Sequence, residues 1–296
     1  MKLTFLGTTC MAPTRERNHT SILLRFNEEG ILFDCGEGTQ RQIRIADHRL
    51  TEVRKIMITH WHGDHVLGLP GFMTSLAASN FVDKLEIYGP AGTRERIGHM
   101  LKAFVFYSPL DYEVFEIGDG IVVDAPNYRI EAHSLDHGIP TLGYTFIEKD
   151  RRKMNLEFLD SLGMPRGPLM GRLQRGDAVE FQGRTVTPDE ATFIVPGRRV
   201  AFMFDTGYCD NCLKMAENAD VLISDATYAS TFDDMADIRG HLTGLQAGQI
   251  AARANARLLV LTHFSNRYVD PTPVEDDARQ AFANVVSAHD FMTLNV

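Results

Sequence analysis

The segment 59–65, which reads Thr-His-Trp-His-Gly-Asp-His and follows the mostly apolar residues 55–58, could carry metal chemistry. Its three histidines and one aspartate supply imidazole nitrogens and a carboxylate oxygen, the ligand set that divalent zinc prefers. The first two histidines are two residues apart, so both rings lie on one side of an extended segment. The aspartate and the third histidine come after a glycine turn, so the four side chains can diverge toward two metal ions. We predict a metal site with ligands His60, His62, Asp64 and His65.

The composition restricts where such a site can operate. The chain has 296 residues, 44% of them hydrophobic and 23% charged, as is typical of a globular protein of one large or two ordinary domains. No apolar run reaches the roughly 18 residues that span a bilayer, and residues 1–7 predict a strand ending in a glycine turn instead of a signal peptide. Four cysteines do not make a disulfide scaffold, so we expect a cytoplasmic protein without membrane contact. The net charge of -9 disfavours indiscriminate nucleic-acid binding but leaves room for a local basic surface.

Short apolar runs that end in an acid or a histidine predict the elements that position these ligands. They are residues 31–33 before Asp34, 56–59 before His60, 200–204 before Asp205, 221–224 before Asp225 and 258–262 before His263. Continuous apolar runs of this length indicate strands buried on both faces, and functional groups collect at the carboxyl ends of such strands. We therefore expect these side chains to converge at one shared edge. The alternative, that aspartate is common where a strand meets a turn, would explain one or two of the five.

Helical patterns alternate with the strands. We expect helices at residues 39–46, 71–79, 93–104, 211–217, 243–254 and 273–283, with a capping box between Thr243 and Gln246. Alternating pieces at 112–116, 128–133 and 141–146 indicate antiparallel strands. The mixture predicts α/β layers. Residues 148–196 are rich in glycine, proline and charge and show little apolar periodicity, so we interpret them as an excursion from the core.

The motifs, taken in order, resemble the metallo-β-lactamase superfamily and, within it, the short form of the ribonuclease Z family of transfer-RNA 3′-processing endonucleases. The resemblance covers nearly the whole chain, and its motifs occur in family order. They are residues 5–8 (Phe-Leu-Gly-Thr), 33–40 (Phe-Asp-Cys-Gly-Glu-Gly-Thr-Gln), 60–65, 68–71 (Gly-Leu-Pro-Gly), 135–140 (Leu-Asp-His-Gly-Ile-Pro), 143–144 (Gly-Tyr), 204–206 (Phe-Asp-Thr), 241–243 (His-Leu-Thr) and 261–268 (Leu-Thr-His-Phe-Ser-Asn-Arg-Tyr).

This resemblance implies an α/β fold, a four-layer αββα sandwich over residues 1–296 as one catalytic domain, with an extruded substrate-binding arm at about residues 150–192. It also implies two Zn²⁺ per chain. By the resemblance, the first zinc is held by His60, His62 and His137, the second by Asp64, His65 and His263, and Asp205 bridges both. The strand ends nominate three of these positions independently. His133 is the fallback for His137, because an even spacing on a strand places both on one face.

The resemblance also implies catalytic roles for three residues. Zinc lowers the pKa of its bound water from about 15.7 to roughly 7, which makes a nucleophile available at neutral pH. Asp64 is the candidate to accept the proton of this water as well as bind metal, and a role as ligand alone carries equal weight. His241, just before a helix start that favours a bound phosphate, is the candidate general acid, and Asp225 would orient it. A solvated histidine and a turn aspartate are the alternatives.

Two positions differ from the family pattern. Residues 224–227 read Ser-Asp-Ala-Thr where the family often has His-Glu-Ala-Thr, and residues 241–243 read His-Leu-Thr where His-Ser-Thr is more familiar. Asp34 could accept a hydrogen bond from the far nitrogen of a ligand histidine or be an ordinary turn residue. The pair Cys209 and Cys212 has metal or redox spacing but no second pair, so we expect no functional role for it.

The excursion carries a local excess of positive charge. Residues 149–175 hold seven basic residues (Lys149, Arg151, Arg152, Lys153, Arg166, Arg172 and Arg175) against three acids. Such a patch can hold folded RNA through its phosphates, although in isolation it would be read as a solvated loop. The resemblance implies an arm here that grips precursor transfer RNA, and a homodimer. We thus predict a zinc-dependent endoribonuclease that removes the 3′ trailer, leaving a 3′-hydroxyl and a 5′-phosphate. The alternatives are a related hydrolase such as a small-molecule phosphodiesterase, or a non-catalytic RNA-binding metalloprotein.

Overall fold

The computed structural model describes residues 1–105 and 110–296, which divide into two compact units. The first unit comprises Met1–Val123, Ile130–Phe146 and Arg199–Val296, and the second comprises Asp124–Arg129 and Ile147–Arg198. The division follows the sequence pattern, because the glycine- and proline-rich excursion lies in the second unit. Each unit builds its own apolar core.

Two seven-stranded sheets form the centre of the first unit. One sheet has the order β18 (Thr293–Asn295), β1 (Lys2–Gly7), β2 (Ser21–Phe26), β3 (Glu29–Phe33), β4 (Val53–Met57), β5 (Leu85–Gly89) and β6 (Tyr112–Glu116). The other has the order β17 (Val285–Ser287), β16 (Leu259–Thr262), β15 (Val221–Asp225), β14 (Arg199–Met203), β9 (Pro140–Glu148), β8 (Tyr128–Asp136) and β7 (Gly120–Asp124). Strands β3 to β6 are parallel, as are β14 to β17. The strands that lead to Asp34 and His60 therefore run in one direction, as do those that lead to Asp205, Asp225 and His263.

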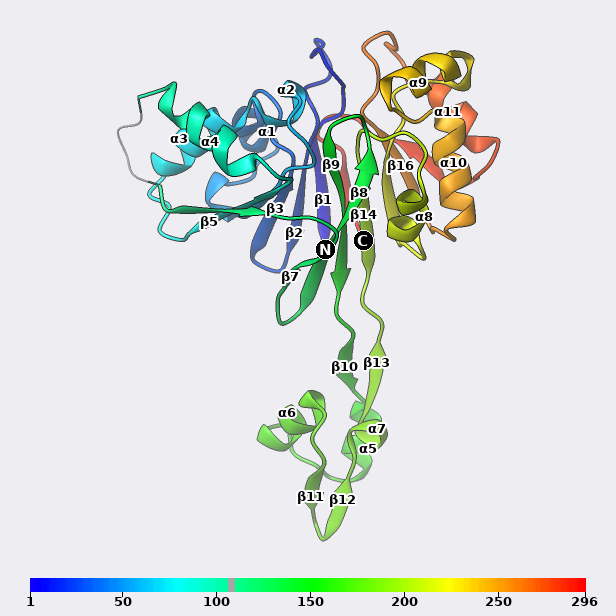
Figure 1. The fold of residues 1–296 in the computed structure, drawn as a ribbon. Helices are drawn as coiled ribbons and strands as arrows, with labels where there is room; N and C mark the ends of the chain where they lie inside the picture. Colours follow the sequence, from blue (N-terminus) through cyan, green and yellow to red (C-terminus); the bar gives the residue numbers. More distant parts are fainter. Residues whose placement is uncertain (106–109) are drawn as a thin grey trace. The chain divides into compact units, whose positions relative to one another are not determined.

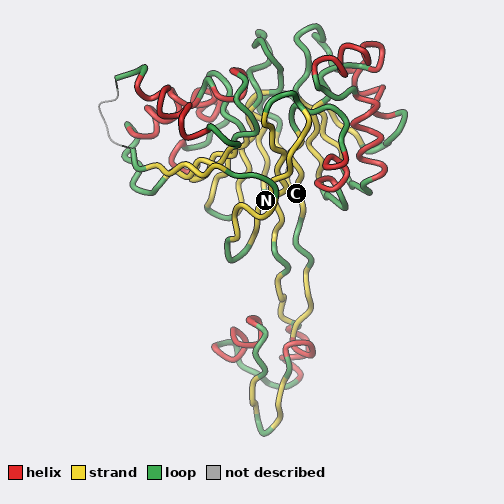
Figure 2. Tube along the Cα trace, in the orientation of Figure 1, coloured by secondary structure: helices red, strands yellow, loops and turns green. Residues whose placement is uncertain are grey.

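Helices cover the outer faces of both sheets (Figures 1 and 2). On the first sheet lie α1 (Thr39–Ile45), α3 (Leu69–Ala77) and α4 (Thr93–Lys102), with α2 (Gly63–Val66) and a 3₁₀ turn at Leu50–Glu52 nearby. On the second lie α8 (Asp210–Ala216), α10 (Gly244–Arg253) and α11 (Thr272–Arg279), joined by α9 (Asp233–Arg239) after a 3₁₀ turn at Ser230–Phe232. This arrangement is an αββα sandwich, and the predicted fold class is confirmed.

Aromatic side chains hold the two sheets together. Phe33 of β3 stacks on Phe202 of β14 with ring centroids 3.5 Å apart, and Phe26 of β2 packs edge-on against Phe146 of β9 at 5.2 Å. The continuous apolar runs are therefore buried from both sides, by the facing sheet and by the covering helices. Tight packing of this kind fixes the strand ends that carry the site residues.

The predicted helices agree with the observed ones to within two residues at nearly every boundary. The capping box is present: Thr243 Oγ1 accepts from the Gln246 backbone N–H, and the Gln246 side chain accepts from the Thr243 N–H. Helix α11 is shorter than predicted and ends at Arg279 instead of 283. The Arg279 guanidinium donates to the carbonyls of Ala283 and Val285, which holds the chain as it turns into β17.

The second unit contains more regular structure than its composition suggests. Strands β10 (Arg151–Met154) and β13 (Thr192–Val195) pair antiparallel, as do β11 (Val179–Phe181) and β12 (Arg184–Val186). Three helices complete it, α5 (Leu156–Ser161), α6 (Pro168–Arg175) and α7 (Pro188–Ala191). Leu159, Met170, Leu173, Val179 and Val186 are buried together in its core. Within the described ranges, no helix of either unit has both the length and the apolarity needed to cross a membrane.

Candidate metal centre

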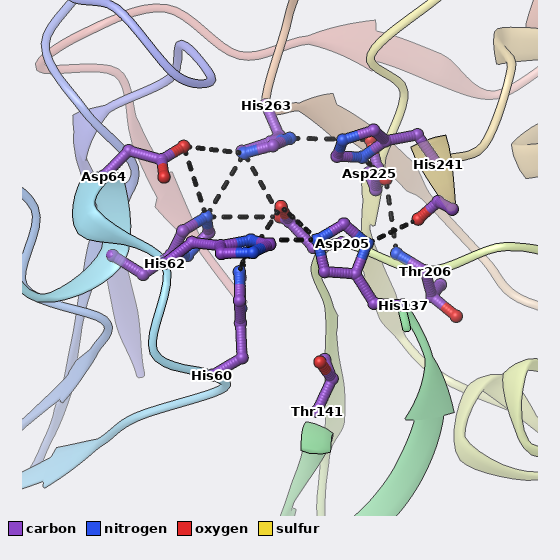
Figure 3. A network of polar contacts seen from close by, with 12 residues as sticks. His60, His62, Asp64, His137, Thr141, Asp205, Thr206, Asp225, His241 and His263 are labelled. Carbon is purple, nitrogen blue, oxygen red and sulfur yellow. Dashed lines mark hydrogen bonds and ion pairs between the residues drawn. The ribbon is translucent and has the colours of Figure 1, made fainter. Parts of the chain in front are cut away.

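The predicted site residues follow the ends of strands from both sheets. Asp34 comes directly after β3 and His60 shortly after β4 in one sheet, whereas Asp205, Asp225 and His263 lie at or just after the ends of β14, β15 and β16 in the other. The prediction of a single shared edge is therefore corrected: the carboxyl ends of two sheets contribute. The side chains of the last four nevertheless converge on one place (Figure 3).

Three of these residues have an unusual backbone. Asp34, Asp205 and His263 have positive φ angles of 55°, 41° and 61°. This left-handed region is sparsely populated by residues with a side chain and is adopted at a cost in free energy. In each case the strand has just ended, and the left-handed residue redirects the chain at the point where its side chain enters the site.

A first cluster of donors forms around His62 (Figure 3). His62 Nδ1 lies 3.0 Å from His60 Nε2 and 3.2 Å from His137 Nε2. Asp205 Oδ2 lies 3.7 Å from His60 Nε2 and 3.6 Å from His137 Nε2. These four donor atoms come from β4, β8 and β14 and the loops that follow them.

A second cluster forms around the other oxygen of Asp205. Asp205 Oδ1 lies 3.3 Å from His65 Nε2 and 3.1 Å from His263 Nε2, and these two nitrogens are 3.3 Å apart. Asp64 Oδ2 lies 3.6 Å from each of the two nitrogens and also accepts a hydrogen bond from the backbone N–H of Met11 at 2.7 Å. Asp205 thus faces each cluster with one carboxylate oxygen.

The spacing of these donors fits metal ions. A tetrahedral zinc with bonds of about 2.0–2.1 Å separates its ligand atoms by about 3.3 Å, close to the distances within both clusters. No hydrogen-bond donor serves Asp205 Oδ1 in the described part of the chain, although this oxygen is buried. A buried carboxylate oxygen without a donor is costly unless a cation compensates it.

Hydrogen bonds to the Nδ1 atoms of His60 and His65, on the side of each ring away from the clusters, set the tautomers of these two histidines. Thr59 Oγ1 donates to Asp34 Oδ2 at 2.8 Å, so it can only accept from His60 Nδ1 at 3.0 Å. The same carboxylate oxygen accepts from His65 Nδ1 at 2.7 Å. Both histidines therefore carry their proton on Nδ1 and present a lone pair on Nε2 to the clusters. Burial raises the pKa of Asp34, against the opposing effect of His65.

A matching arrangement supports the other half of the site. Thr227 Oγ1 donates to Asp225 Oδ1 at 2.6 Å and accepts from His263 Nδ1 at 3.0 Å. Asp225 Oδ2 lies 2.9 Å from His241 Nδ1. His137 is oriented differently, because its Nδ1 donates to the carbonyl of Gly240 at 2.7 Å. Lone pairs of His65 and His263 then face each other at 3.3 Å, an arrangement that a bound cation stabilises.

Electrostatics within the centre favours ionised carboxylates. Burial alone would raise the pKa of Asp205, but the rings of His263, His65 and His60 outweigh it and hold this pKa well below its ordinary value. For His241 the directions are reversed. Burial alone would lower its pKa, but the neighbouring Asp225 carboxylate outweighs burial and raises it. The His241 side chain is 12% exposed and lies within reach of Asp205 and His263.

Glycines let the two ligand-bearing loops of the first sheet pack together. A Cβ added at Gly68 would lie 2.0 Å from the carbonyl oxygen of Gly36, and one added at Gly36 would lie 2.5 Å from that of Asp64. Backbone hydrogen bonds run between the loops, from Cys35 N to His65 O and from Gly68 N to Cys35 O. The close approach of the loops brings His65 Nδ1 within hydrogen-bond distance of Asp34 Oδ2.

The structure brings together all of the predicted ligands and the predicted acid–base residues. The fallback His133 lies elsewhere on β8, with its Nε2 3.3 Å from Thr145 Oγ1. Sequence reasoning missed Thr59 and Thr227 as supports of the ligand histidines and Gly240 as the carbonyl that fixes His137. The two threonines could have been nominated from the sequence, because each stands at most two residues from a predicted site residue. Cys209 and Cys212 form a separate thiol pair with sulfur atoms 3.5 Å apart.

A hollow of about 480 Å³ lies over the centre. Its walls include site residues and several residues that the sequence did not nominate. The latter are Cys10, Met11, His19, Leu67, Tyr228 and Arg239. The hollow is open to solvent, so a ligand can reach the centre.

Comparison with known proteins places this centre in a family. Two family models each match less than half of the chain, the anti-Pycsar protein Apyc1 over residues 1–110 and a beta-lactamase superfamily domain over residues 172–264. A ribonuclease Z of Methanosarcina acetivorans is 38% identical over 100% of this chain and 98% of its own. A ribonuclease Z of Methanothermobacter thermautotrophicus is 39% identical over 100% of this chain and 97% of its own.

A solved structure agrees. The crystal structure of the short form of human tRNase Z matches with a TM-score of 0.73 and 27% identity, covering 100% of this chain and 99% of that one. Full-length similarity at this level, together with the convergence of the motif residues, leads to one conclusion: the chain belongs to the ribonuclease Z family.

Proposed function

We propose that this protein is a metal-dependent endoribonuclease that removes the 3′ trailer from precursor transfer RNA, leaving a 3′-hydroxyl on the transfer RNA and a 5′-phosphate on the trailer. The observation that carries the proposal is the position of Asp205, whose two oxygens serve separate histidine clusters. Centres with two adjacent metal sites are suited to phosphodiester cleavage, because they act on both the attacking and the leaving oxygen. The relatives bear the name ribonuclease Z and extend over the same length.

The donor set supports two zinc ions per chain. The first would be held by His60, His62 and His137 and the second by Asp64, His65 and His263, with Asp205 shared. Imidazole and carboxylate ligands at tetrahedral spacing suit zinc. When bound, the ions would supply a water of lowered pKa and positive charge that stabilises the transition state.

The protein's own groups would handle the protons. Asp64 lies at the wall of the hollow with an oxygen near the second cluster, so it can accept a proton from the attacking water in addition to binding metal. His241 lines the same hollow and would donate a proton to the leaving 3′ oxygen. Asp225 holds His241 by Nδ1, which leaves Nε2 as the atom that faces the substrate.

The second unit would bind the body of the transfer RNA. We assign it the role of the substrate-binding arm within a single catalytic domain, in a protein that works as a homodimer in the cytoplasm. Arg151, Lys153, Arg166, Arg172 and Arg175 are exposed on this unit. Exposed guanidinium and ammonium groups bind phosphates of folded RNA with a strong dependence on salt. Four free thiols are compatible with a reducing compartment.

One assay tests the function directly. Purified protein is incubated with precursor transfer RNA labelled at its 5′ end, with and without a chelator, and with zinc restored. We expect a single shortened product with a 3′-hydroxyl, its loss with chelator and its recovery with zinc. Hydrolysis of small phosphodiesters without cleavage of the precursor would instead indicate a phosphodiesterase, and RNA binding without product would indicate a non-catalytic protein.

A further inference from the structure

A second hollow lies beside the one that covers the metal centre. Its volume is about 440 Å³, and it shares His137 and Arg239 with the first. The backbone of Gly240 belongs to its wall, and the Gly240 carbonyl is the group that orients His137. The two hollows are therefore adjacent, separated by a ligand histidine and the segment that leads to His241.

Tyr208 gives this second hollow an aromatic surface. The residue follows Asp205 by three positions, lines the hollow and is 39% exposed. Its hydroxyl accepts a hydrogen bond from the Arg253 guanidinium, whose central carbon lies 5.9 Å from the ring centroid. An exposed ring that is held in place by its hydroxyl group can stack on a flat ligand with little loss of conformational entropy.

The charges of the hollow favour a nucleobase over a phosphate. Asp136 and Asp237 are exposed and line it, and their carboxylates repel a phosphate but accept hydrogen bonds from exocyclic amino groups. Arg239, at the junction of the two hollows, is the cation that can instead contact the backbone of a bound strand. Stacking on an aromatic ring with hydrogen bonds to the base edge is how unpaired RNA is usually recognised.

The position relative to His241 decides which nucleotide enters. In the proposed reaction, His241 protonates the 3′ oxygen that leaves, so the nucleotide carrying that oxygen departs from the centre on the His241 side. The segment 239–241 forms this side, and its first two residues line the second hollow.

We propose that the hollow at Tyr208 is the subsite for the base of the nucleotide immediately 5′ of the scissile phosphate, with Tyr208 as the stacking platform. This inference rests on the proposed function and adds to it the location of the last transfer-RNA nucleotide. The subsite would hold the transfer-RNA end in register while His241 acts.

The test combines two variants with three substrates. Tyr208→Ala and Tyr208→Phe are compared with wild type on an unmodified precursor, on one abasic at the nucleotide 5′ of the cut, and on one abasic at the nucleotide 3′ of it. We expect Tyr208→Ala to raise KM on the unmodified precursor about tenfold, the loss of affinity that removal of one stacking ring typically causes. Tyr208→Phe keeps the ring, so its KM should stay close to that of wild type. On the precursor abasic 5′ of the cut, Tyr208→Ala should cause no further loss.

The outcomes separate this inference from the proposed function. If wild-type protein leaves the precursor uncut, the proposed function fails. If wild type cuts but Tyr208→Ala leaves KM unchanged, the subsite is refuted. It is also refuted if Tyr208→Ala raises KM as much on the precursor abasic 5′ of the cut as on the unmodified one. Loss of the effect only on the precursor abasic 3′ of the cut would refute the assignment to the 5′ nucleotide. Tyr112→Ala, which removes a similarly exposed tyrosine from β6, is the matched control.

Discussion

His241 Nδ1 lies 2.9 Å from Asp225 Oδ2, and the same carboxylate supports a predicted metal ligand through Thr227. Asp225 is fully buried and is held by several donors, so it cannot turn away from either partner. One aspartate thus links the proposed general acid to the second metal cluster. Asp225 is the last residue of β15, and its short side chain is long enough to reach His241 from there.

Replacing His241 should separate proton donation from metal binding. His241 lies within ligand distance of Asp205 and His263, but it is not one of the seven predicted ligands, so we expect His241→Ala to keep two metal ions per chain. Turnover of precursor transfer RNA should fall by about 10²–10⁴, the usual contribution of a general acid. Elemental analysis and single-turnover cleavage measure the two quantities on the same sample. Equal loss of metal and turnover would mean that His241 acts as a structural residue.

Asp225→Ala should behave differently from His241→Ala. It removes the acceptor of Thr227 as well as that of His241, so His263 loses its orientation and we expect metal affinity to fall together with turnover. His133→Ala is the matched control, because His133 lies on β8 with Thr145 as its neighbour. It should change neither quantity.

Much of this centre could be predicted from sequence because the signals are local. A strand end such as Phe33 followed by Asp34 shows in the apolar pattern, and the capping box shows in the spacing of Thr243 and Gln246. The ligand motif at residues 60–65 is contiguous. The assignment of His137 over His133 needed the family resemblance, since strand periodicity treats them alike.

The remainder depends on contacts between distant parts of the chain. The strand ends belong to two sheets, which pairing between distant strands defines and contacts such as Phe33 on Phe202 hold face to face, and periodicity reveals neither. The hydroxyl groups of Thr59 and Thr227 act only because Asp34 and Asp225 stand opposite them. The core residues of the second unit come from short apolar pieces separated by polar residues, glycine and proline, so no long apolar run marks them in the sequence.

Thr59 should control the affinity of the first metal cluster. Thr59→Val keeps the shape of the side chain but removes the hydroxyl that accepts from His60 Nδ1 and donates to Asp34. We expect a 10- to 100-fold weaker binding of one metal ion, as is typical when a support of a ligand histidine is lost. Competition with a fluorescent chelator measures it. Thr74→Val, which removes a hydroxyl bonded only to a carbonyl within α3, should leave both affinities unchanged.

The basic residues of α6 and its preceding loop should set the salt dependence of substrate binding. Replacing Arg166, Arg172 and Arg175 by alanine removes three exposed cations from the second unit. If each contacts a phosphate, the slope of log affinity against log salt should become shallower by about 2–3, and KM should rise at physiological salt. Replacing the exposed Arg41, Arg44 and Arg49 of the first unit is the control. An equal change of the salt slope and of KM in both triple variants would rule out a specific role of the second unit.

Deletion of residues 150–196, the larger part of the second unit, tests the same role more strongly. Residues 150–196 can be replaced by a short glycine linker, because Glu148 N donates to Arg198 O at 2.8 Å and the two ends are therefore adjacent. Hydrolysis of a small phosphodiester should persist, since the metal donors all lie in the first unit. Processing of precursor transfer RNA should collapse. Undiminished processing would rule out the second unit as the substrate-binding arm.

Cys209 should react as a thiolate at mildly acidic pH. A hydrogen bond from the Cys212 thiol, helped by weaker hydrogen bonds, outweighs burial and lowers the pKa of Cys209 to about 6. Alkylation by iodoacetamide, followed by peptide mass spectrometry, should therefore show a midpoint near pH 6 for Cys209. In Cys212→Ala the midpoint should move toward about 8.5, the value of an ordinary thiol. Cys10 and Cys35, whose thiol pKa values are raised by burial, should stay unmodified as internal controls.

Asp290 should make folding stability fall as the pH rises. Its carboxylate accepts hydrogen bonds from Thr8 Oγ1, Asn18 N and Gln42 Nε2, yet burial raises its pKa to about 6. The folded protein therefore binds this proton more tightly than the unfolded chain does, so the contribution to stability is complete below about pH 4 and is lost as the pH rises through 6.

Asp290→Asn is uncharged at every pH and can keep the bonds to Asn18 and Gln42. We expect the free energy of unfolding of wild type, relative to Asp290→Asn, to decline by about 2 kcal/mol between pH 3.5 and 7.5 in urea titrations. Other carboxyl groups titrate in both proteins and cancel in this difference, so a flat difference would mean that Asp290 is not held in the protonated form by its surroundings.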